Sequence, residues 1–331
     1  MNRKLKVGVI GCGNISDSYF EHARNYEFME IMACADILQS AVQAKAEKYK
    51  LKAMSVSELL TDNNIAVVIN LTTPKAHAVV NKQILEAGKH VYCEKPWTLD
   101  ADQAISSLRV FSDAGLKVAI GHNRRFAPNT QAMKKLLQDG DLGAPIHIDG
   151  HFDANLPPNA GMWRDNRAES PAGGMTSLGI HALDMFINLF GRIRDVNVQS
   201  KRIASTIDVD DTTLVRINFE NGRTGHLTTI SATNMLWRVA VFCTGGWVEI
   251  RDQDKLEVSS IADGNTTQTY SGYGYPALAT IQAALEAFAT DISGGQAFPI
   301  SAAEIEHATK ALEAIVISAE TGKIVSLCKA D

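Results

Sequence analysis

The stretch from Val7 to Ser16 reads Val-Gly-Val-Ile-Gly-Cys-Gly-Asn-Ile-Ser, a β-prone run followed by a glycine turn and the start of a helical pattern. A dinucleotide site needs that order, because backbone N–H groups and a helix N-terminus must approach the pyrophosphate without intervening side chains. Ser16 stands at the third small position and leaves less room than glycine. The stretch predicts a phosphate-binding turn, with an ordinary structural loop as the alternative. The candidate cofactor contacts here are Gly11, Gly13, Asn14 and Ile15.

Length and composition describe an ordinary globular protein. The chain has 331 residues, which fits two domains with a sizeable core in each. Charged residues make up 21% of the chain and the formal net charge is −5, so we expect no nucleic acid partner. No apolar run approaches the roughly 18 uncharged residues of a membrane span, and glycines interrupt the apolar stretch near the N-terminus. We therefore expect a cytoplasmic protein without a membrane partner.

Neither the cysteines nor the histidines predict a metal site. The five cysteines are scattered, with no close pair that would indicate zinc ligation or a disulfide framework, so buried thiols are the preferred interpretation. His147, His151 and Asp153 alternate along one strand pattern, which is more typical of a solvated sheet face than of metal ligands. We predict no bound metal. The cysteines are Cys12, Cys34, Cys93, Cys243 and Cys328.

The N-terminal part alternates short β-branched runs with helical patterns. This alternation implies βαβ units and a doubly wound parallel sheet, the Rossmann arrangement. Gly88 and Gly115 stand where helix C-caps belong. We place the domain boundary near residue 122, which gives a nucleotide-binding domain over residues 1–122 and a second α/β domain over residues 123–331. The predicted strands cover residues 6–10, 31–35, 66–70, 90–93 and 117–120, and the predicted helices residues 41–49, 76–87 and 102–114.

Asp36 adds a second point to the dinucleotide pattern. It ends the second predicted strand, roughly two dozen residues after the glycines, where a carboxylate can accept hydrogen bonds from the adenosine ribose hydroxyls. A carboxylate there repels a 2′-phosphate, and residues 37–39 supply no arginine to bind one. The sequence therefore favours NAD over NADP. The alternative is a surface aspartate that caps the next helix.

Two loops follow the third and fourth predicted strands, at the sheet edge where open α/β sheets bind ligands. Lys95 stands out among their polar residues, because a lysine with a lowered pKa can exchange a proton with a hydroxyl and polarise a carbonyl. Standing alone, it would be a solvated surface lysine. The candidate cofactor contacts in the first loop are Thr72, Thr73, Pro74 and His77, and those in the second loop are Glu94, Lys95 and Pro96.

These motifs together resemble the Gfo/Idh/MocA oxidoreductase family. The resemblance covers essentially the full length, and Glu-Lys-Pro after the fourth strand is its most specific part. It implies an N-terminal Rossmann domain, a C-terminal α/β domain with a large open-faced, mainly antiparallel sheet, and hydride exchange between a nicotinamide and a substrate alcohol carbon of a sugar, inositol or related polyol. The motifs are Gly11-Cys-Gly13, Asp36, Glu94-Lys95-Pro96, Asn123-Arg-Arg-Phe126 and a glycine-rich helix start with His181 and Asp184.

The resemblance also implies substrate contacts in the second half. Arg125 would lie near the substrate, with a surface or interdomain salt bridge as the alternative. The segment 154–174 lacks either periodicity, and there Trp163 would stack on a sugar face and Arg164 would bind a hydroxyl or carboxylate. A loop packed by its own aromatic anchor is equally consistent with that segment.

Ser177 is the clearest departure from the family pattern, which usually has Asp four residues before the histidine. Ser177, His181 and Asp184 are spaced four and three apart, so on a helix their side chains share a face. With a hydroxyl in place of the carboxylate, the acid/base role falls on Lys95 and His181, and Ser177 remains a candidate substrate contact. We interpret Asp184 as a partner in helix packing or in positioning its neighbours.

The last third predicts a sheet and two closing helices. Residues 196–203, 212–219, 223–230, 239–242, 247–251 and 255–259 alternate in strand fashion, and residues 277–292 and 302–321 show helical patterns. The sheet has one mainly apolar face and one mixed face, and exposed mixed faces often bind a partner. Several family members form dimers or tetramers through this sheet, so the resemblance implies a homodimer or homotetramer.

The sequence thus predicts an NAD-dependent oxidoreductase that interconverts a secondary alcohol of a sugar, polyol or cyclitol and its ketone. Lys95 would move the hydroxyl proton, His181 would support the relay, and Arg125, Trp163 and Arg164 would orient the substrate. The alternative is a dinucleotide-binding sensor on the same scaffold with no turnover, which Ser177 keeps open.

Overall fold

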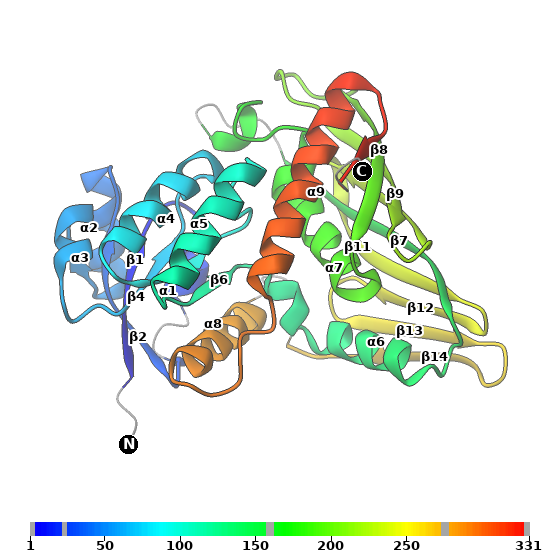
Figure 1. The fold of residues 1–331 in the computed structure, drawn as a ribbon, viewed down its shortest axis with the longest axis horizontal. Coiled ribbons are helices and arrows are strands. Elements are labelled where there is room, and N and C mark those ends of the chain that lie inside the picture. The colour runs from blue at the N-terminus through cyan, green and yellow to red at the C-terminus, as the bar shows by residue number, and fades with distance from the viewer. Residues whose placement is uncertain (1–3, 22–24, 157–161, 273–277, 328–331) are drawn as a thin grey trace. The chain divides into compact units, whose positions relative to one another are not determined.

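The computed structural model describes residues 4–21, 25–156, 162–272 and 278–327 (Figure 1). Cys328, the prolines Pro157 and Pro158 and the first residue of the predicted helix 277–292 lie outside this part of the chain. The chain forms two compact units. The first comprises Met1–Asn123 and Pro276–Thr309, and the second comprises Arg124–Tyr275 and Lys310–Asp331.

The first unit contains a six-stranded parallel sheet in the order β3-β2-β1-β4-β5-β6. The chain runs outward from β1 through β2 to β3 and then crosses back to β4, so the carboxyl ends of β1 and β4 meet at the point where the strand order reverses. The doubly wound prediction is confirmed. The strands are β1 (Leu5–Ile10), β2 (Met29–Ala35), β3 (Lys52–Ala53), β4 (Val67–Asn70), β5 (His90–Cys93) and β6 (Val118–Ile120).

The helices of the first unit follow the predicted pattern with one addition. The predicted C-cap glycines are confirmed, because Gly88 and Gly115 adopt φ of 68° and 67° just after α4 and α5. The addition is the short α3, while α1 begins where the helical pattern after the glycine turn was expected. A capping box between Ser55 and Glu58 starts α3. The helices are α1 (Ser16–Phe20), α2 (Gln39–Tyr49), α3 (Val56–Thr61), α4 (His77–Glu86), α5 (Ala101–Asp113) and α8 (Leu278–Ile292).

The second unit contains a nine-stranded mixed sheet in the order β14-β13-β12-β11-β7-β10-β9-β8-β15. Among the described strands of this second sheet, only β7 and β10 pair in parallel, so the prediction of a mainly antiparallel sheet is confirmed. The strands are β7 (Pro145–Asn155), β8 (Ile193–Lys201), β9 (Thr212–Phe219), β10 (Thr224–Ile230), β11 (Ala232–Cys243), β12 (Gly246–Arg251), β13 (Lys255–Ser260), β14 (Gly264–Thr269) and β15 (Val325–Ser326).

One face of the second sheet is covered by helix α7 (Ile180–Phe190). Gly150 of β7 permits this contact, because a Cβ there would lie 2.8 Å from the Phe186 ring. The neighbouring Asp149 and His151 point to the opposite face and are partly exposed. Two α-helices of the described residues remain. Helix α6 (Pro128–Asp139) belongs to the second unit, and the residues of α9 (Ala302–Thr321) are divided between the two units.

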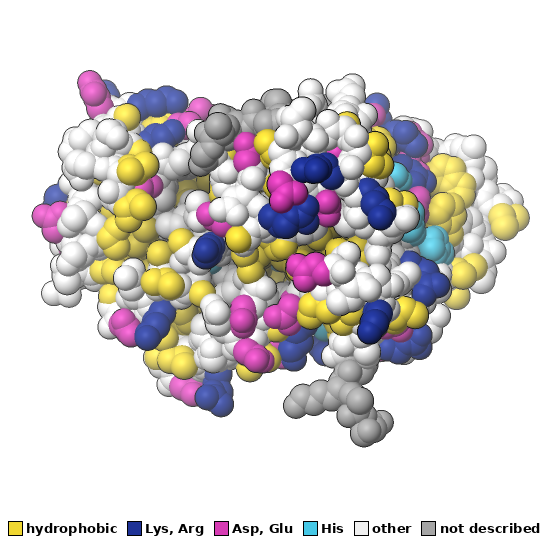
Figure 2. Space-filling model, turned by 90° about the horizontal axis from the view of Figure 1, so that it is seen from above, with side chains coloured by type: hydrophobic (Ala, Val, Ile, Leu, Met, Phe, Trp, Pro, Cys, Tyr) yellow, Lys and Arg dark blue, Asp and Glu magenta, His cyan; other side chains and the backbone are white. Residues whose placement is uncertain are grey.

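On the face that Figure 2 shows, Lys and Arg side chains are interspersed with Asp and Glu. Among the described helices, none combines the length and apolar character needed to cross a membrane.

Candidate active site

The glycine turn follows β1 and has the geometry of a close-approach loop. Gly11 has φ of 110°, and a Cβ there would lie 2.5 Å from the Leu71 carbonyl carbon. Only glycine fits such a position. At Gly13, by contrast, a Cβ would meet no heavy atom of the described chain within 4 Å. The first glycine is therefore required by the protein's own packing, and the second leaves open space.

Ser16 explains how this turn dispenses with a third glycine. Its side chain is fully buried, and its hydroxyl donates to the Gly13 carbonyl oxygen at 2.7 Å. The serine therefore closes the turn and starts α1 at once. Asn14 and Ile15 lie exposed at the tip of the turn, with Ile15 42% exposed.

Asp36 links the glycine turn to the end of β2. Its Oδ2 accepts the Cys12 N–H at 2.7 Å, and its Oδ1 accepts the Leu38 N–H at 2.9 Å. Two backbone N–H groups thus orient the carboxylate at the carboxyl end of the strand. Asp36 is not the N-cap of the following helix, because α2 begins at Gln39 and its N-cap is Leu38.

The loop after β4 is built on buried amides. The Asn70 side-chain oxygen accepts the Thr72 hydroxyl at 2.7 Å, and its amide donates to Asn81 of α4 at 2.8 Å. Asn70 and Asn81 are both fully buried. This network holds Thr72 at the sheet edge, while Thr73 is exposed and Pro74 is buried at the start of the next helical turn.

His77 is buried between two loops. One ring nitrogen lies 3.0 Å from the Thr72 carbonyl oxygen and the other 2.5 Å from the Pro96 carbonyl oxygen. Burial lowers the pKa of His77, which favours the neutral form of its ring. His77 is 1% exposed and ties the loop after β4 to the segment after β5, and the cofactor contact predicted for it stays a prediction.

The Glu94–Lys95–Pro96 segment follows β5 directly. The Glu94 carboxylate accepts the Tyr19 hydroxyl at 2.6 Å through one oxygen and the Lys95 N–H at 3.1 Å through the other. The Glu94 N–H in turn donates to the Asn70 carbonyl oxygen at 2.9 Å. The Lys95–Pro96 peptide is cis, and Lys95 is partly exposed. The segment is therefore anchored to α1 and to the end of β4.

Arg125 in the second unit forms a buried ion pair with Asp184. Its Nε lies 3.0 and 2.9 Å from the two carboxylate oxygens, and its Nη2 lies 2.7 Å from Oδ1. The two side chains are 5% and 2% exposed. The pair connects the segment before α6 to α7, which also carries His181. This ion pair corresponds to the salt-bridge alternative for Arg125, except that both of its residues belong to the second unit.

Arg124 is also occupied within the second unit. Its guanidinium lies 5.1 Å from the Trp237 ring centroid and 5.7 Å from that of Phe152, and it donates to the Gln253 side chain. Phe152 in turn packs against His181, with ring centroids 5.8 Å apart. Sequence reasoning gave Arg124 no role, and the structure puts it in the aromatic cluster beneath His181.

The helix that carries Ser177 and His181 begins with a π-helical turn, Met175–Gly179, before α7. Gly191 ends α7 with φ of 87°. A Cβ at Gly179 would lie 2.4 Å from the Met175 sulfur and 2.6 Å from the Thr229 methyl group, so this turn packs tightly on β10. Ser177 is 5% exposed and His181 is partly exposed. π-Turns are frequent at functional sites.

Trp163 and Arg164 lie in a short 3₁₀ turn, Trp163–Asp165. The Arg164 guanidinium lies 4.5 Å from the Trp163 ring centroid, so the two side chains stack on each other. Both are partly exposed. The pair presents an aromatic face and a cation, the two groups that sugar recognition uses, and it equally fits a loop with its own anchor.

The histidines of β7 bind neighbours on the sheet and do not form a ligand cluster. His147 lies 2.8 Å from the Thr224 hydroxyl, and His151 lies 3.4 Å from the Asp153 carboxylate. Within the described ranges, no group of three His, Cys, Asp or Glu side chains is arranged to hold a metal ion. The four described cysteines are buried free thiols, as predicted.

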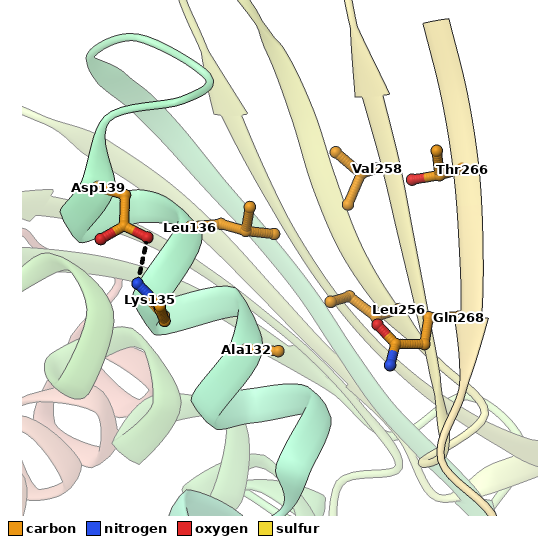
Figure 3. Close-up of a pocket in the computed structure, with 8 residues that line it drawn as sticks. All are labelled: Ala132, Lys135, Leu136, Asp139, Leu256, Val258, Thr266 and Gln268. Atoms are coloured by element: carbon orange, nitrogen blue, oxygen red, sulfur yellow. Dashed lines mark hydrogen bonds and ion pairs between the residues drawn. The ribbon is translucent and has the colours of Figure 1, made fainter. Parts of the chain in front are cut away.

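A pocket of about 360 Å³ lies elsewhere in the second unit, between α6 and the strands β13 and β14 (Figure 3). Leu136, Leu256 and Val258 give it an apolar wall, and an ion pair between Lys135 and Asp139 lies on the helix beside it. None of its lining residues is among the predicted cofactor, catalytic or substrate residues. The pocket is therefore distinct from the candidate active-site residues.

The predicted residues fall into two groups. The cofactor candidates and Lys95 gather at the carboxyl ends of β1, β2, β4 and β5, whereas Arg125, Trp163, Arg164, Ser177 and His181 belong to the second unit. Sequence reasoning missed Tyr19, the partner of Glu94. No local pattern in the sequence links Tyr19 to Glu94, because the two residues are 75 positions apart.

Comparisons with known proteins match both parts of the chain. Residues 5–122 match the family model described as "Oxidoreductase family, NAD-binding Rossmann fold", and residues 130–249 match the GFO/IDH/MocA C-terminal domain. Both models describe the GFO/IDH/MocA family, and together they cover more than half of the chain.

Individual relatives match in sequence or in structure. An uncharacterized oxidoreductase of Schizosaccharomyces pombe is 32% identical over 217 residues, 62% of this chain and 58% of that protein. An inositol 2-dehydrogenase of Rhizobium meliloti is 30% identical over 168 residues, 49% of this chain and 51% of that protein. A levoglucosan dehydrogenase in complex with NADH and levoglucosan superimposes with a TM-score of 0.88 at 21% identity, covering 98% of this chain and 100% of that one.

These matches differ in reach. The chain spans between half and two thirds of the length of the curated relatives it matches. The structural match covers nearly everything, but at 21% identity it establishes the fold alone.

Proposed function

Because the chain belongs to the GFO/IDH/MocA family of NAD-binding oxidoreductases, we propose that it is a dehydrogenase acting on a secondary alcohol of a sugar, polyol or cyclitol. The similarity to an inositol 2-dehydrogenase and to a levoglucosan dehydrogenase supports this substrate class. The observation that carries the proposal is the anchored Glu94–Lys95–Pro96 segment, which puts a lysine at the carboxyl end of β5 beside β4.

The residues of the first unit fit a dinucleotide. Gly11 has no room for a side chain on the protein side, while the space beside Gly13 is open for a ligand. Asn14, Ile15, Thr72 and Thr73 border the same sheet edge, and Asp36 would accept the ribose hydroxyls. When bound, the nicotinamide supplies the hydride chemistry that no side chain possesses.

NAD is the preferred cofactor in this proposal. The oriented Asp36 carboxylate repels a 2′-phosphate, and the described loop after it, residues 37–39, carries no cation. Titration of the protein with NADH and NADPH, followed by cofactor fluorescence, tests this. We expect Asp36→Ser to narrow the preference for NADH at least about tenfold, since one repulsive contact of this kind is worth about 1.4 kcal/mol or more. Equal binding of both cofactors by the unaltered protein contradicts the assignment.

In the proposed reaction, Lys95 Nζ takes the proton of the substrate hydroxyl during oxidation and returns it during reduction. His181 supports the proton relay, and Ser177 contributes a hydroxyl beside it on the same helical segment. Trp163 and Arg164 orient the substrate. Arg125 acts indirectly, because its pairing with Asp184 holds the helix that carries His181.

A polyol and sugar panel with NAD, followed through the absorbance of NADH, tests the reaction. Lys95→Met is expected to lower kcat by about 10²-fold or more, the usual range for a lost acid/base group, while NADH binding persists. Lys82→Met is the matched control, because Lys82 is a 73% exposed lysine of the same unit. Unchanged turnover in Lys95→Met with the true substrate would sink the proposal.

A second candidate function, a dinucleotide sensor without turnover, is favoured by Ser177. This buried residue, 5% exposed, replaces the carboxylate expected from the resemblance. Tight NADH binding with no absorbance change across the panel supports the sensor. A gain of activity in Ser177→Asp would also support the sensor, because it would show that the missing carboxylate prevents turnover.

We also propose a homodimer or homotetramer formed through the outer face of the second sheet. There, Phe242 is 37% exposed and packs beside His147, while Arg238 pairs with Asp149 and Glu249. Sedimentation equilibrium tests this. The unaltered chain is expected to sediment as an oligomer, and Phe242→Glu is expected to shift it toward the monomer; a monomeric unaltered chain contradicts the proposal.

A further inference from the structure

Tyr19 of α1 carries a contact that the reaction outlined above leaves unexplained. Its side chain has no exposed surface, and its hydroxyl donates to Glu94 Oε1 at 2.6 Å. The two residues are 75 positions apart in the chain. Hydrogen bonds from a hydroxyl to a carboxylate are short and roughly twice as strong as neutral ones. The contact is therefore a specific tie between α1 and the segment after β5.

The other oxygen of the same carboxylate binds the next residue. Glu94 Oε2 accepts the Lys95 N–H at 3.1 Å, so the carboxylate joins the Tyr19 hydroxyl to the Lys95 main chain. Burial, and then the nearby Glu94 carboxylate, raise the pKa of Tyr19 well above its usual range. The hydroxyl thus remains a donor at every working pH.

Helix α1 begins at the glycine turn and carries Tyr19, so it connects the turn to the Glu94 carboxylate. Ser16 closes the turn on Gly13, and Tyr19 lies three residues later on the same face. The Tyr26 hydroxyl donates to the Tyr19 carbonyl oxygen at 2.8 Å, and the Tyr92 ring packs edge-on against the Tyr19 ring at 6.2 Å between centroids. The Tyr19 side chain is therefore held in one position.

We propose that Tyr19 is a positioning residue that fixes Glu94, and through it the main chain of Lys95, relative to the dinucleotide turn. The inference rests on the proposed function of Lys95. A group held in place before the reaction loses less freedom on reaching the transition state, and a small misplacement of such a group lowers the rate steeply. Tyr19 would then act on the rate and not on the affinity for the cofactor.

Tyr19→Phe tests this with minimal change in shape. We expect kcat to fall between about tenfold and about a hundredfold, the fold-change that corresponds to a lost hydrogen bond to a charged group, with KM and NADH affinity within about threefold of the unaltered protein. The matched control is Tyr49→Phe. Tyr49 donates to the Asp17 carboxylate, also at 2.6 Å and also on α1, but away from Glu94. We expect its kcat to be unchanged.

A double-mutant cycle separates positioning from a general loss of stability. Glu94→Leu removes both carboxylate oxygens and with them the acceptor of the Tyr19 hydroxyl, so Tyr19→Phe should cost almost no further kcat in that background if Tyr19 acts through Glu94. Additive losses, or equal losses in Tyr19→Phe and Tyr49→Phe, would overturn the inference. If Lys95→Met retains full turnover, the proposed function itself fails; if Lys95→Met is inactive while Tyr19→Phe is fully active, only the inference about Tyr19 fails.

Discussion

The buried ion pair between Arg125 and Asp184 makes a prediction about stability in the second unit. Asp184→Asn keeps the shape of the side chain and removes its charge. The guanidinium then loses a carboxylate that three contacts of 2.7 to 3.0 Å had bound, in a site where the two side chains are 5% and 2% exposed. The change leaves a buried arginine charge uncompensated.

The size of the effect follows from that burial. Removing one partner of a buried pair costs about 3–5 kcal/mol, because the remaining buried charge loses its carboxylate counter-ion. At about 2–4 °C for each kcal/mol in a unit of 150–250 residues, a cost of about 3 kcal/mol corresponds to a fall in Tm of about 6–12 °C. Asp184 lies one turn after His181, so kcat should fall as well.

Thermal unfolding followed by tryptophan fluorescence measures this change selectively. Three of the four tryptophans, Trp163, Trp237 and Trp247, belong to the second unit. Asp139→Asn is the control, since Asp139 pairs with Lys135 at 2.6 Å in a site where the two side chains are 42% and 75% exposed. Exposed pairs contribute little, so the control Tm should stay almost unchanged.

Two outcomes would refute the reasoning. The first is an equal Tm for Asp184→Asn and Asp139→Asn, which would mean that burial does not set the cost. The second comes from the double variant with Arg125→Met and Asp184→Leu, which replaces the pair by apolar groups. Such replacements are often neutral or stabilising, so this variant should recover most of the lost Tm. If it is no more stable than Asp184→Asn, an uncompensated charge is not the cause.

Two further predictions concern the first unit. Gly11 has φ of 110° and no room for a Cβ, so Gly11→Ala should lower both Tm and NADH affinity. Gly13→Ala should keep the Tm of the unaltered protein and weaken NADH binding in a fluorescence titration. Unchanged NADH binding in Gly13→Ala contradicts a phosphate site at this turn. At Asp17, burial acts to raise the pKa, but hydrogen bonds from Lys45, Tyr49 and Lys48 prevail and lower it from 3.8 to about 2. A pKa that is lowered in the folded state stabilises the protein above the unfolded-state pKa, and this stabilisation is lost as the pH falls. Urea unfolding should therefore show Asp17→Asn to be less stable than the unaltered protein at pH 6, and this difference in stability should shrink between about pH 4 and 2. A difference in stability that does not depend on pH contradicts the prediction.

The sequence predicted best where burial imposes a pattern on residue types. Strands β1, β4 and β5 lie inside a parallel sheet, so their residues form apolar runs that end at turn residues, and each was predicted within two residues. The glycine turn was predictable for the same local reason, since Gly11 adopts a backbone conformation that other residues avoid.

Elements without such a pattern escaped prediction. The edge strand β14 reads Gly-Asn-Thr-Thr-Gln-Thr and is exposed along its whole length, so no hydrophobic alternation marks it. β3 has two residues, too few to show any period. Helix α3 did carry a signal, because Ser55 and Glu58 form a capping box, a pattern visible in the sequence.

Side-chain partners were the least predictable part of the candidate site. Lys95 and His181 stand beside the ends of elements, where local patterns single them out. Their supports come from far along the chain, since Asp184 lies 59 positions from Arg125 and Glu94 lies 75 positions from Tyr19. Only the folded sheet brings such residues together. The ordinary appearance of Tyr19 in the sequence is thus expected, because a buried tyrosine reads as core until the carboxylate beneath its hydroxyl is known.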